Sequence, residues 1–104
     1  MRYRSLGSTG NKVSILSLGG SALGSVYRET NLDDSIAVVQ ESIKAGINLI
    51  DAAPWYGHGK AEEVLGKAFA GVPRESFYYN TKVCRYNAEP LEMFDFRAER
   101  TLQV

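Results

Sequence analysis

The sequence predicts an α/β protein built on a parallel sheet, and two observations support this prediction. Short runs of strand-forming residues alternate along the chain with longer segments of helical periodicity. Their spacing is that of βαβ units, in which helices join parallel strands. The chain has 104 residues, 44% hydrophobic and 23% charged, which is ordinary for one globular domain.

Charge and cysteine content exclude several kinds of partner and site. Twelve basic and twelve acidic residues give a formal net charge of zero, so we expect neither nucleic acid nor an anionic membrane as a partner. No apolar run approaches the ~20 residues of a membrane span, and no signal-peptide core follows Met1, so the cytoplasm is the default compartment. Cys84, the one cysteine, has no Cys or His at ligand spacing, so we expect no disulfide and no metal site.

The N-terminal part predicts a β-hairpin followed by a glycine-rich turn. Residues 2–6 and 12–16 flank a loop of residues that tolerate positive φ, and the second run continues to Leu18. The turn at residues 19–24 would let a nucleotide approach the backbone. However, Ser25 stands where the G-x-x-x-x-G phosphate loop requires Lys, and G-x-G-x-x-G fails at Ser21. A plain strand-to-loop turn therefore stays as an alternative to a binding loop.

Two amphipathic helices are predicted next. Asn31 is a suitable N-cap, and apolar residues then recur at helical spacing up to Gly46, a natural C′ residue. The second helix covers about residues 60–69 and ends before Pro73. Its apolar face consists of Ala61, Val64, Leu65 and Ala68.

Two strands follow these helices in alternation, and each ends at a charged residue. Residues 48–50 form a short buried strand that ends at Asp51. Residues 77–81 form the next strand, which ends at Lys82. A loop is predicted from residue 83 to 94, and Asp95 is expected to cap a last helix that runs to the C-terminus.

The charged strand ends predict a site. Parallel α/β folds place their chemistry at the carboxyl ends of strands, and an ionised carboxylate there needs a partner. If the two strands are neighbours about 4.8 Å apart, Asp51 and Lys82 can pair, with Tyr56 reaching in from the loop. These three residues are a candidate acid/base group. From the residues alone, a structural ion pair is the competing interpretation, and Trp55 and Tyr56 could be loop aromatics that only pack.

Three motifs around the predicted site resemble those of a known family. The run Gly-Ile-Asn-Leu-Ile-Asp-Ala-Ala at residues 46–53, Trp-Tyr-Gly at 55–57 and Glu-Glu-Val-Leu-Gly-Lys-Ala at 62–68 resemble the signature of the aldo-keto reductases. The resemblance spans the chain, from the residue 3–10 hairpin to Asn-Thr-Lys-Val at 80–83. Arg-Tyr at 85–86 and residues 94–101 resemble the branch of galactose, fucose and related aldose dehydrogenases.

The resemblance implies a TIM (β/α)₈ barrel closed at its bottom by the hairpin, with NAD or NADP across its C-terminal face. It implies catalytic roles for Asp51, Tyr56 and Lys82, a cofactor site that includes Gly19, Gly20, Ser21 and Asp51, and a substrate-pocket wall at Trp55. The family's catalytic histidine follows the fourth barrel strand. His58, the only histidine here, stands in the wrong motif to replace it.

The chemistry implied is hydride transfer between a nicotinamide and a carbonyl or sugar substrate. The carbonyl oxygen needs a proton donor, which is Tyr56. A free tyrosine phenol titrates near about 10, so an ammonium nearby is needed to favour phenolate. Lys82 supplies that charge, and Asp51 keeps it protonated and oriented.

A closed barrel takes about 250 residues, so the chain is expected to supply roughly three of eight strands. We therefore expect residues 1–104 to be part of an NADP-dependent oxidoreductase domain, truncated within the third helix and inactive alone. The alternative is a non-catalytic product that binds a partner, such as full-length subunits, through its exposed sheet. Completion of a barrel by several copies is disfavoured, because three strands do not divide into eight.

Overall fold

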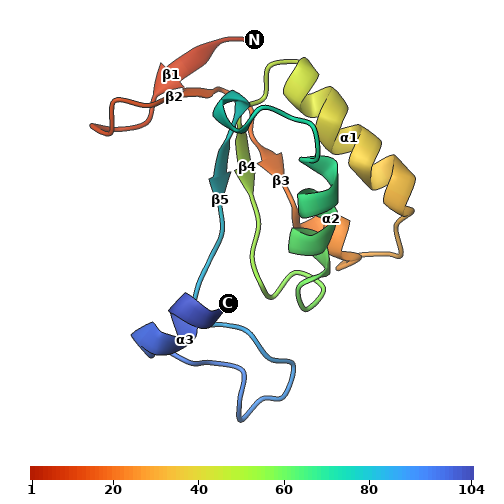
Figure 1. Ribbon diagram of the computed structural model, residues 1–104, viewed down its shortest axis with the longest axis vertical. Helices are drawn as coiled ribbons and strands as arrows, with labels where there is room; N and C mark the ends of the chain where they lie inside the picture. The colour runs from red at the N-terminus through yellow and green to blue at the C-terminus, as the bar shows by residue number, and fades with distance from the viewer.

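The computed structural model describes residues 1–104 and contains two sheets and three α-helices (Figure 1). Strands β1 (Tyr3–Ser5) and β2 (Lys12–Ser14) pair antiparallel as the predicted hairpin. Strands β3 (Leu18–Gly19), β4 (Leu49–Asp51) and β5 (Tyr78–Asn80) form a parallel sheet in that order. The predicted run from residue 12 to 18 is therefore divided between both sheets.

Two helices cover one face of the parallel sheet. Helix α1 (Leu32–Lys44) begins where the Asn31 side chain accepts a hydrogen bond from the Asp34 backbone N–H, which confirms the predicted cap. It ends at Ala45, and Gly46 follows at φ +98°, a conformation that favours glycine. Helix α2 (Lys60–Ala68) also lies where it was predicted.

The core lies between these helices and the sheet. Val39 of α1, Ile50 of β4 and Leu65 of α2 are fully buried at its centre. The aromatic rings of Phe69 and Phe77 stack at 4.3 Å between centroids and extend the core past the end of α2. Strand alternation places Ile50 on this face, so Leu49 and Asp51 face the other way.

The hairpin is fastened to the amino end of the parallel sheet. The Asn48 side chain accepts from the Ser14 backbone N–H at 2.7 Å and donates to the Lys12 carbonyl at 3.1 Å. The Tyr3 phenol donates to the Gly46 carbonyl at 2.8 Å. The hairpin thus lies at the opposite end of the strands from residues 83–104, as Figure 1 shows.

The segment from Val83 onward corrects one prediction. Asp95 does not cap the last helix, because α3 (Ala98–Gln103) begins after Arg97 as its N-cap. The Asp95 carboxylate instead accepts from the Arg97 backbone N–H and guanidinium, so it is already engaged two residues before the N-cap. The 3₁₀ segments η1 (Ser21–Gly24) and η2 (Arg74–Ser76) complete the fold.

The three-stranded parallel sheet is open, so the chain forms a partial α/β barrel without closing it. Its face opposite the helices carries Leu49 and Tyr78, and Tyr78 is exposed. No helix of the structure has both the length and the apolar character needed to cross a bilayer.

Candidate active site

Three neighbouring strands place small and polar residues in one row at their carboxyl ends. Gly19 pairs with Asp51, and Asp51 pairs with Asn80, in the parallel register. Paired residues of neighbouring strands point to the same face, so this row lies on the face away from the helices. A hollow of about 350 Å³ opens on that face. It is lined by Leu6, Leu49, Asp51, Tyr78, Tyr79 and Asn80.

Lys82 connects the predicted site residues. Its Nζ donates to Asp51 Oδ2 at 2.8 Å, to the Ala52 carbonyl at 2.9 Å and to the Tyr56 phenol oxygen at 3.3 Å. An ammonium has three donors, and all three are used. Burial acts to lower the pKa of Lys82, but its bonds to Asp51 and Tyr56 outweigh this and raise the pKa, so the ammonium form is stabilised.

Asp51 divides its two oxygens between two donors. Oδ2 accepts from Lys82, while Oδ1 accepts from the side-chain amide of Asn80. Burial acts to raise the pKa of Asp51, but these hydrogen bonds and the Lys82 charge together lower it. The carboxylate is thus held ionised and fixed in orientation.

Tyr56 stands on a loop whose path depends on close backbone contact. A Cβ added at Gly57 would lie 2.1 Å from the Gly24 carbonyl oxygen, and φ at Gly57 is +65°. Only glycine suits both conditions. The Tyr56 carbonyl then accepts from the Ala61 backbone N–H at 3.1 Å, which joins the loop to the first turn of α2. The phenol is in this way set at the carboxyl end of β4.

Helix α2 also holds the end of β5. The Thr81 hydroxyl donates to Glu62 Oε1 at 2.5 Å, immediately before Lys82. Thr81 thus bonds to α2, whereas Asn80 and Lys82 both reach the Asp51 carboxylate. The Glu62–Thr81 bond therefore anchors the backbone from which Lys82 reaches Asp51 and Tyr56.

Trp55 precedes Tyr56 on the same loop and is half-buried. The guanidinium carbon of Arg85 lies 3.7 Å from its ring centroid, and the His58 ring meets it edge-on at 4.9 Å. His58 is exposed and makes no side-chain hydrogen bond to Tyr56 or Lys82. The chain's one histidine is thus outside the Asp51–Lys82–Tyr56 group.

The residues expected to contact a cofactor differ in their surroundings. Gly19 is exposed beside Asp51, and a Cβ there would meet no atom within 4 Å, so the position is open to a ligand. Gly20 is buried and donates to the Asp51 carbonyl at 2.7 Å, and its missing side chain is explained by packing, because a Cβ would lie 2.9 Å from that oxygen. Ser21 begins η1 and is half-buried.

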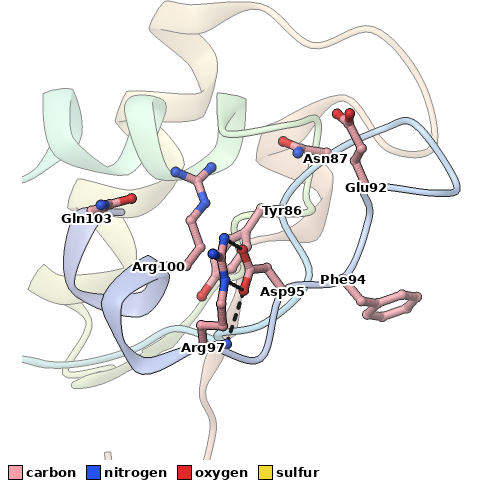
Figure 2. Close-up of a pocket in the computed structure, with 8 residues that line it drawn as sticks. All are labelled: Tyr86, Asn87, Glu92, Phe94, Asp95, Arg97, Arg100 and Gln103. Atoms are coloured by element: carbon pink, nitrogen blue, oxygen red, sulfur yellow. Dashed lines mark hydrogen bonds and ion pairs between the residues drawn. The ribbon is translucent and has the colours of Figure 1, made fainter.

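A second hollow lies in the segment from residue 83 to 104, and Figure 2 shows its lining. Its volume is about 400 Å³. Arg97 forms a bidentate pair with Asp95, and Arg100 lies over the Tyr86 ring at 5.3 Å. Because these cations are already engaged and no nucleophile or base is activated there, the hollow is a weaker candidate than the strand ends.

Sequence reasoning missed Asn80, Glu62 and Arg85 as contributors to this region. A signal for Asn80 was available, since Asn80 precedes Lys82 by two residues at the end of the predicted strand, and alternation there places both on one face. The Glu62–Thr81 and Arg85–Trp55 contacts join segments distant in the sequence, and periodicity within one element does not predict them.

Comparison with known proteins shows the family to which the chain belongs. The model of the Aldo/keto reductase family matches residues 15–103. The chain is 44% identical over 102 residues to L-galactose dehydrogenase from Arabidopsis thaliana, covering 96% of this chain and 31% of that protein.

Solved structures match as well. An aldo-keto reductase from Pseudomonas aeruginosa superposes with a TM-score of 0.80 at 34% identity, covering 97% of this chain and 38% of that one. An aldo-keto reductase from Klebsiella pneumoniae in complex with NADPH gives 0.65 at 30% identity, covering 88% and 31% respectively. The chain spans about a third of the length of these relatives. It is a member of the aldo/keto reductase family, and its fold is part of that family's barrel.

Proposed function

We propose that Asp51, Lys82 and Tyr56 form the proton-transfer part of an NAD(P)-dependent oxidoreductase site. The reaction is hydride transfer between a carbonyl compound and its alcohol, or between an aldose and its lactone. The observation that carries this proposal is the position of Lys82 Nζ, which bridges the Asp51 carboxylate and the Tyr56 phenol.

Tyr56 gives up or takes the proton. Because Lys82 donates to the phenol oxygen, the phenol's own hydrogen is free to point to a substrate carbonyl oxygen. When that oxygen takes the proton, negative charge develops on the phenol oxygen 3.3 Å from the ammonium, which stabilises it. In the oxidative direction the phenolate accepts the alcohol proton.

Asp51 and Asn80 act on Lys82 rather than on the substrate. The ionised carboxylate keeps Lys82 protonated and turns one ammonium donor away from the phenol. Asn80 holds the second carboxylate oxygen, so Asp51 does not rotate. This arrangement fixes which group carries each proton before a substrate arrives.

A nicotinamide cofactor, when bound, supplies or accepts the hydride. The open position at Gly19 beside Asp51 fits the nicotinamide end of such a cofactor, with Ser21 at its border. Gly20 contributes by holding the Gly19 backbone against β4. The relative solved with NADPH supports a cofactor of this class, and NAD and NADP are both compatible with the residues.

The substrate class we propose is an aldose or another small carbonyl compound. The name of the Arabidopsis relative, L-galactose dehydrogenase, supports an aldose. Trp55, adjacent to Tyr56 and half-buried, supplies a flat wall for the substrate. No histidine joins Tyr56 within residues 1–104, so we expect the 104-residue chain alone not to turn over.

The test places the segment in a complete barrel. Residues 15–103 replace the matching segment of the full-length Arabidopsis relative, and NAD(P)H formation or consumption is followed with L-galactose and with small aldehydes. We expect turnover by the chimera. Tyr56→Phe should lower kcat by at least about 100-fold, the usual contribution of a positioned acid or base.

Tyr78→Phe is the matched control. It removes a phenol from the same open face, but Tyr78 makes no hydrogen bond to Lys82. We expect kcat to stay within about threefold of the parent, because the phenol that is removed takes no part in the hydrogen bonds of Lys82. Equal losses in both variants, or full activity in the Tyr56→Phe chimera, would show that Tyr56 is not the proton donor.

A further inference from the structure

Arg85 is a cation without a counter-ion beside the proposed site. The four ion pairs of the chain involve Lys44, Lys67, Lys82 and Arg97, and none includes Arg85. Its Nε donates to Met93 Sδ at 3.3 Å, whereas the two terminal nitrogens have no partner in the chain. A guanidinium offers five donors, so most of its capacity is free.

The Arg85 side chain is nevertheless held in place. Its guanidinium carbon lies 3.7 Å from the Trp55 ring centroid and 5.7 Å from that of Phe94. Stacking on aromatic faces orients the planar group while leaving its edge open. The cation is therefore arranged before any ligand binds.

The backbone around Arg85 is fixed by a short two-stranded contact. Arg85 bridges Phe94 antiparallel, and the Tyr86 N–H donates to the Met93 carbonyl at 2.9 Å. The Asp95 N–H donates to the Cys84 carbonyl, also at 2.9 Å. These bonds pair residues 84–86 with residues 93–95 and hold the backbone of Arg85 in the position from which its side chain stacks on Trp55.

The stack lies at the same end of the sheet as the reacting group. Trp55 precedes Tyr56 in the sequence, and Arg85 follows Lys82 by three residues, so both loops leave the same end of the sheet. Figure 1 shows the loop before α2 and the segment after β5 at that end. The Arg85–Trp55 stack and the Tyr56 phenol therefore both lie beyond the carboxyl ends of β4 and β5.

We infer that Arg85 is a specificity-determining residue that binds a carboxylate on the substrate. The fork of free N–H groups matches the two oxygens of a carboxylate, and no acidic side chain of the chain competes for it. The preferred substrate is then a carbonyl compound with an acidic group at its other end, such as a sugar acid. This inference rests on the proposed function, since it concerns the same site.

The experiment uses the 104-residue chain and its only tryptophan. Trp55 fluorescence reports on the stacked guanidinium, because no other indole contributes. D-galacturonate and its neutral counterpart D-galactose are titrated separately at matched ionic strength, since screening weakens exposed charge interactions. We expect a saturable change with galacturonate and binding of galactose at least about tenfold weaker.

Arg85→Gln should weaken galacturonate binding by at least about tenfold, the loss expected when a charged contact is removed. Arg100→Gln is the control, because Arg100 also lies over an aromatic ring, that of Tyr86, but not over Trp55. It should leave galacturonate binding unchanged. Equal binding of both sugars, retained binding in Arg85→Gln, or no fluorescence change with galacturonate would each overturn the inference.

The readout involves no hydride transfer, so the two proposals can fail separately. A chimera without turnover, together with Arg85-dependent galacturonate binding, would reject only the oxidoreductase assignment. Turnover that depends on Tyr56, together with no effect of Arg85→Gln on galacturonate binding, would reject only the carboxylate assignment.

Discussion

The Asp51–Lys82 and Asp95–Arg97 pairs have nearly equal N–O distances, 2.8 and 2.7 Å, but they are built differently. Asp51 and Lys82 are 31 residues apart and meet because β4 and β5 are neighbours. Asp95 and Arg97 are two residues apart and meet within one turn. The first pair depends on the packed sheet, whereas the second depends on local backbone geometry.

This difference separates two regions of the molecule. Residues up to Lys82 contain all the members of the hydrophobic core. From Val83 onward only Tyr86 is buried, and Phe96 and Leu102 are 78% and 87% exposed. We conclude that packing of the hydrophobic core positions the proposed active-site residues. Residues 83–104 contact the site region through the Arg85–Trp55 stack and contribute no residue to that core.

The largest effect should come from the core. Leu65→Ala removes a fully buried side chain between α2 and the sheet, and we expect a loss of about 2–5 kcal/mol in the free energy of unfolding. Leu102→Ala, the same change on exposed α3, should stay within about 0.5 kcal/mol. Urea denaturation followed by circular dichroism measures both. Similar losses for the two variants would contradict the division into two regions.

A smaller effect is expected from Lys82→Met. Asp51 and Lys82 side chains are 39% and 47% exposed, so solvent screening limits the pair to roughly 0–1 kcal/mol of stability. Lys67→Met, which removes the partner of Glu63 on α2, is the control. We expect it to lower the free energy of unfolding by less than Lys82→Met does.

The pH dependence of this pair has a defined sign at each end. The pKa of Asp51 is lowered in the folded state, so its contribution is complete above the unfolded value of about 3.9 and is lost as pH falls through the folded pKa. The pKa of Lys82 is raised, so its contribution is complete below about 10.4 and is lost as pH rises through the folded pKa. The difference in unfolding free energy between parent and Lys82→Met should therefore be constant at intermediate pH and shrink at both extremes. A difference that varies between pH 5 and 9 would implicate another group.

The fold was predictable where one short pattern decides an element. The Asn31 cap with its periodic apolar residues predicted α1. The run at residues 48–50 predicted β4 as a short buried strand, but it did not indicate that only Ile50 is buried. The meeting of Asp51, Tyr56 and Lys82 followed from placing two strand ends at one edge. Their assignment as catalytic residues came from the motif resemblance and stays a prediction.

Other features escaped because they depend on contacts between distant segments. Aspartate is a preferred N-cap residue, but the Asp95 carboxylate binds the guanidinium of Arg97 instead, and the helix begins after Arg97. Arg85 reads as a polar loop residue until the chain reversal at Phe94 brings it onto Trp55. Side-chain competition of this kind is not encoded in periodicity.

The role of Asn80 can be tested by its effect on the neighbouring carboxylate. Asn80→Ala removes the donor to Asp51 Oδ1 but leaves Lys82 in place, so the pKa of Asp51 should rise, and by less than in Lys82→Met. Carboxyl carbon NMR shifts of Asp51, titrated with pH, measure this directly. Asn80→Asp should raise the pKa further by adding a like charge. An unchanged Asp51 pKa in Asn80→Ala would mean that the amide does not orient the carboxylate.

The smallest effect on overall stability belongs to the local pair. Hydrogen bonds from Arg97 lower the pKa of Asp95 to about 2, and Arg97→Gln should return it toward the ordinary Asp value. Because Asp95 and Arg97 lie in one turn outside the core, the same variant should leave the urea midpoint unchanged. The carboxyl titration of Asp95 and the urea midpoint, measured on one sample, thus separate local charge pairing from global stability. If Arg97→Gln lowered the midpoint as much as Lys82→Met does, the turn at residues 95–97 would be part of the cooperative core after all.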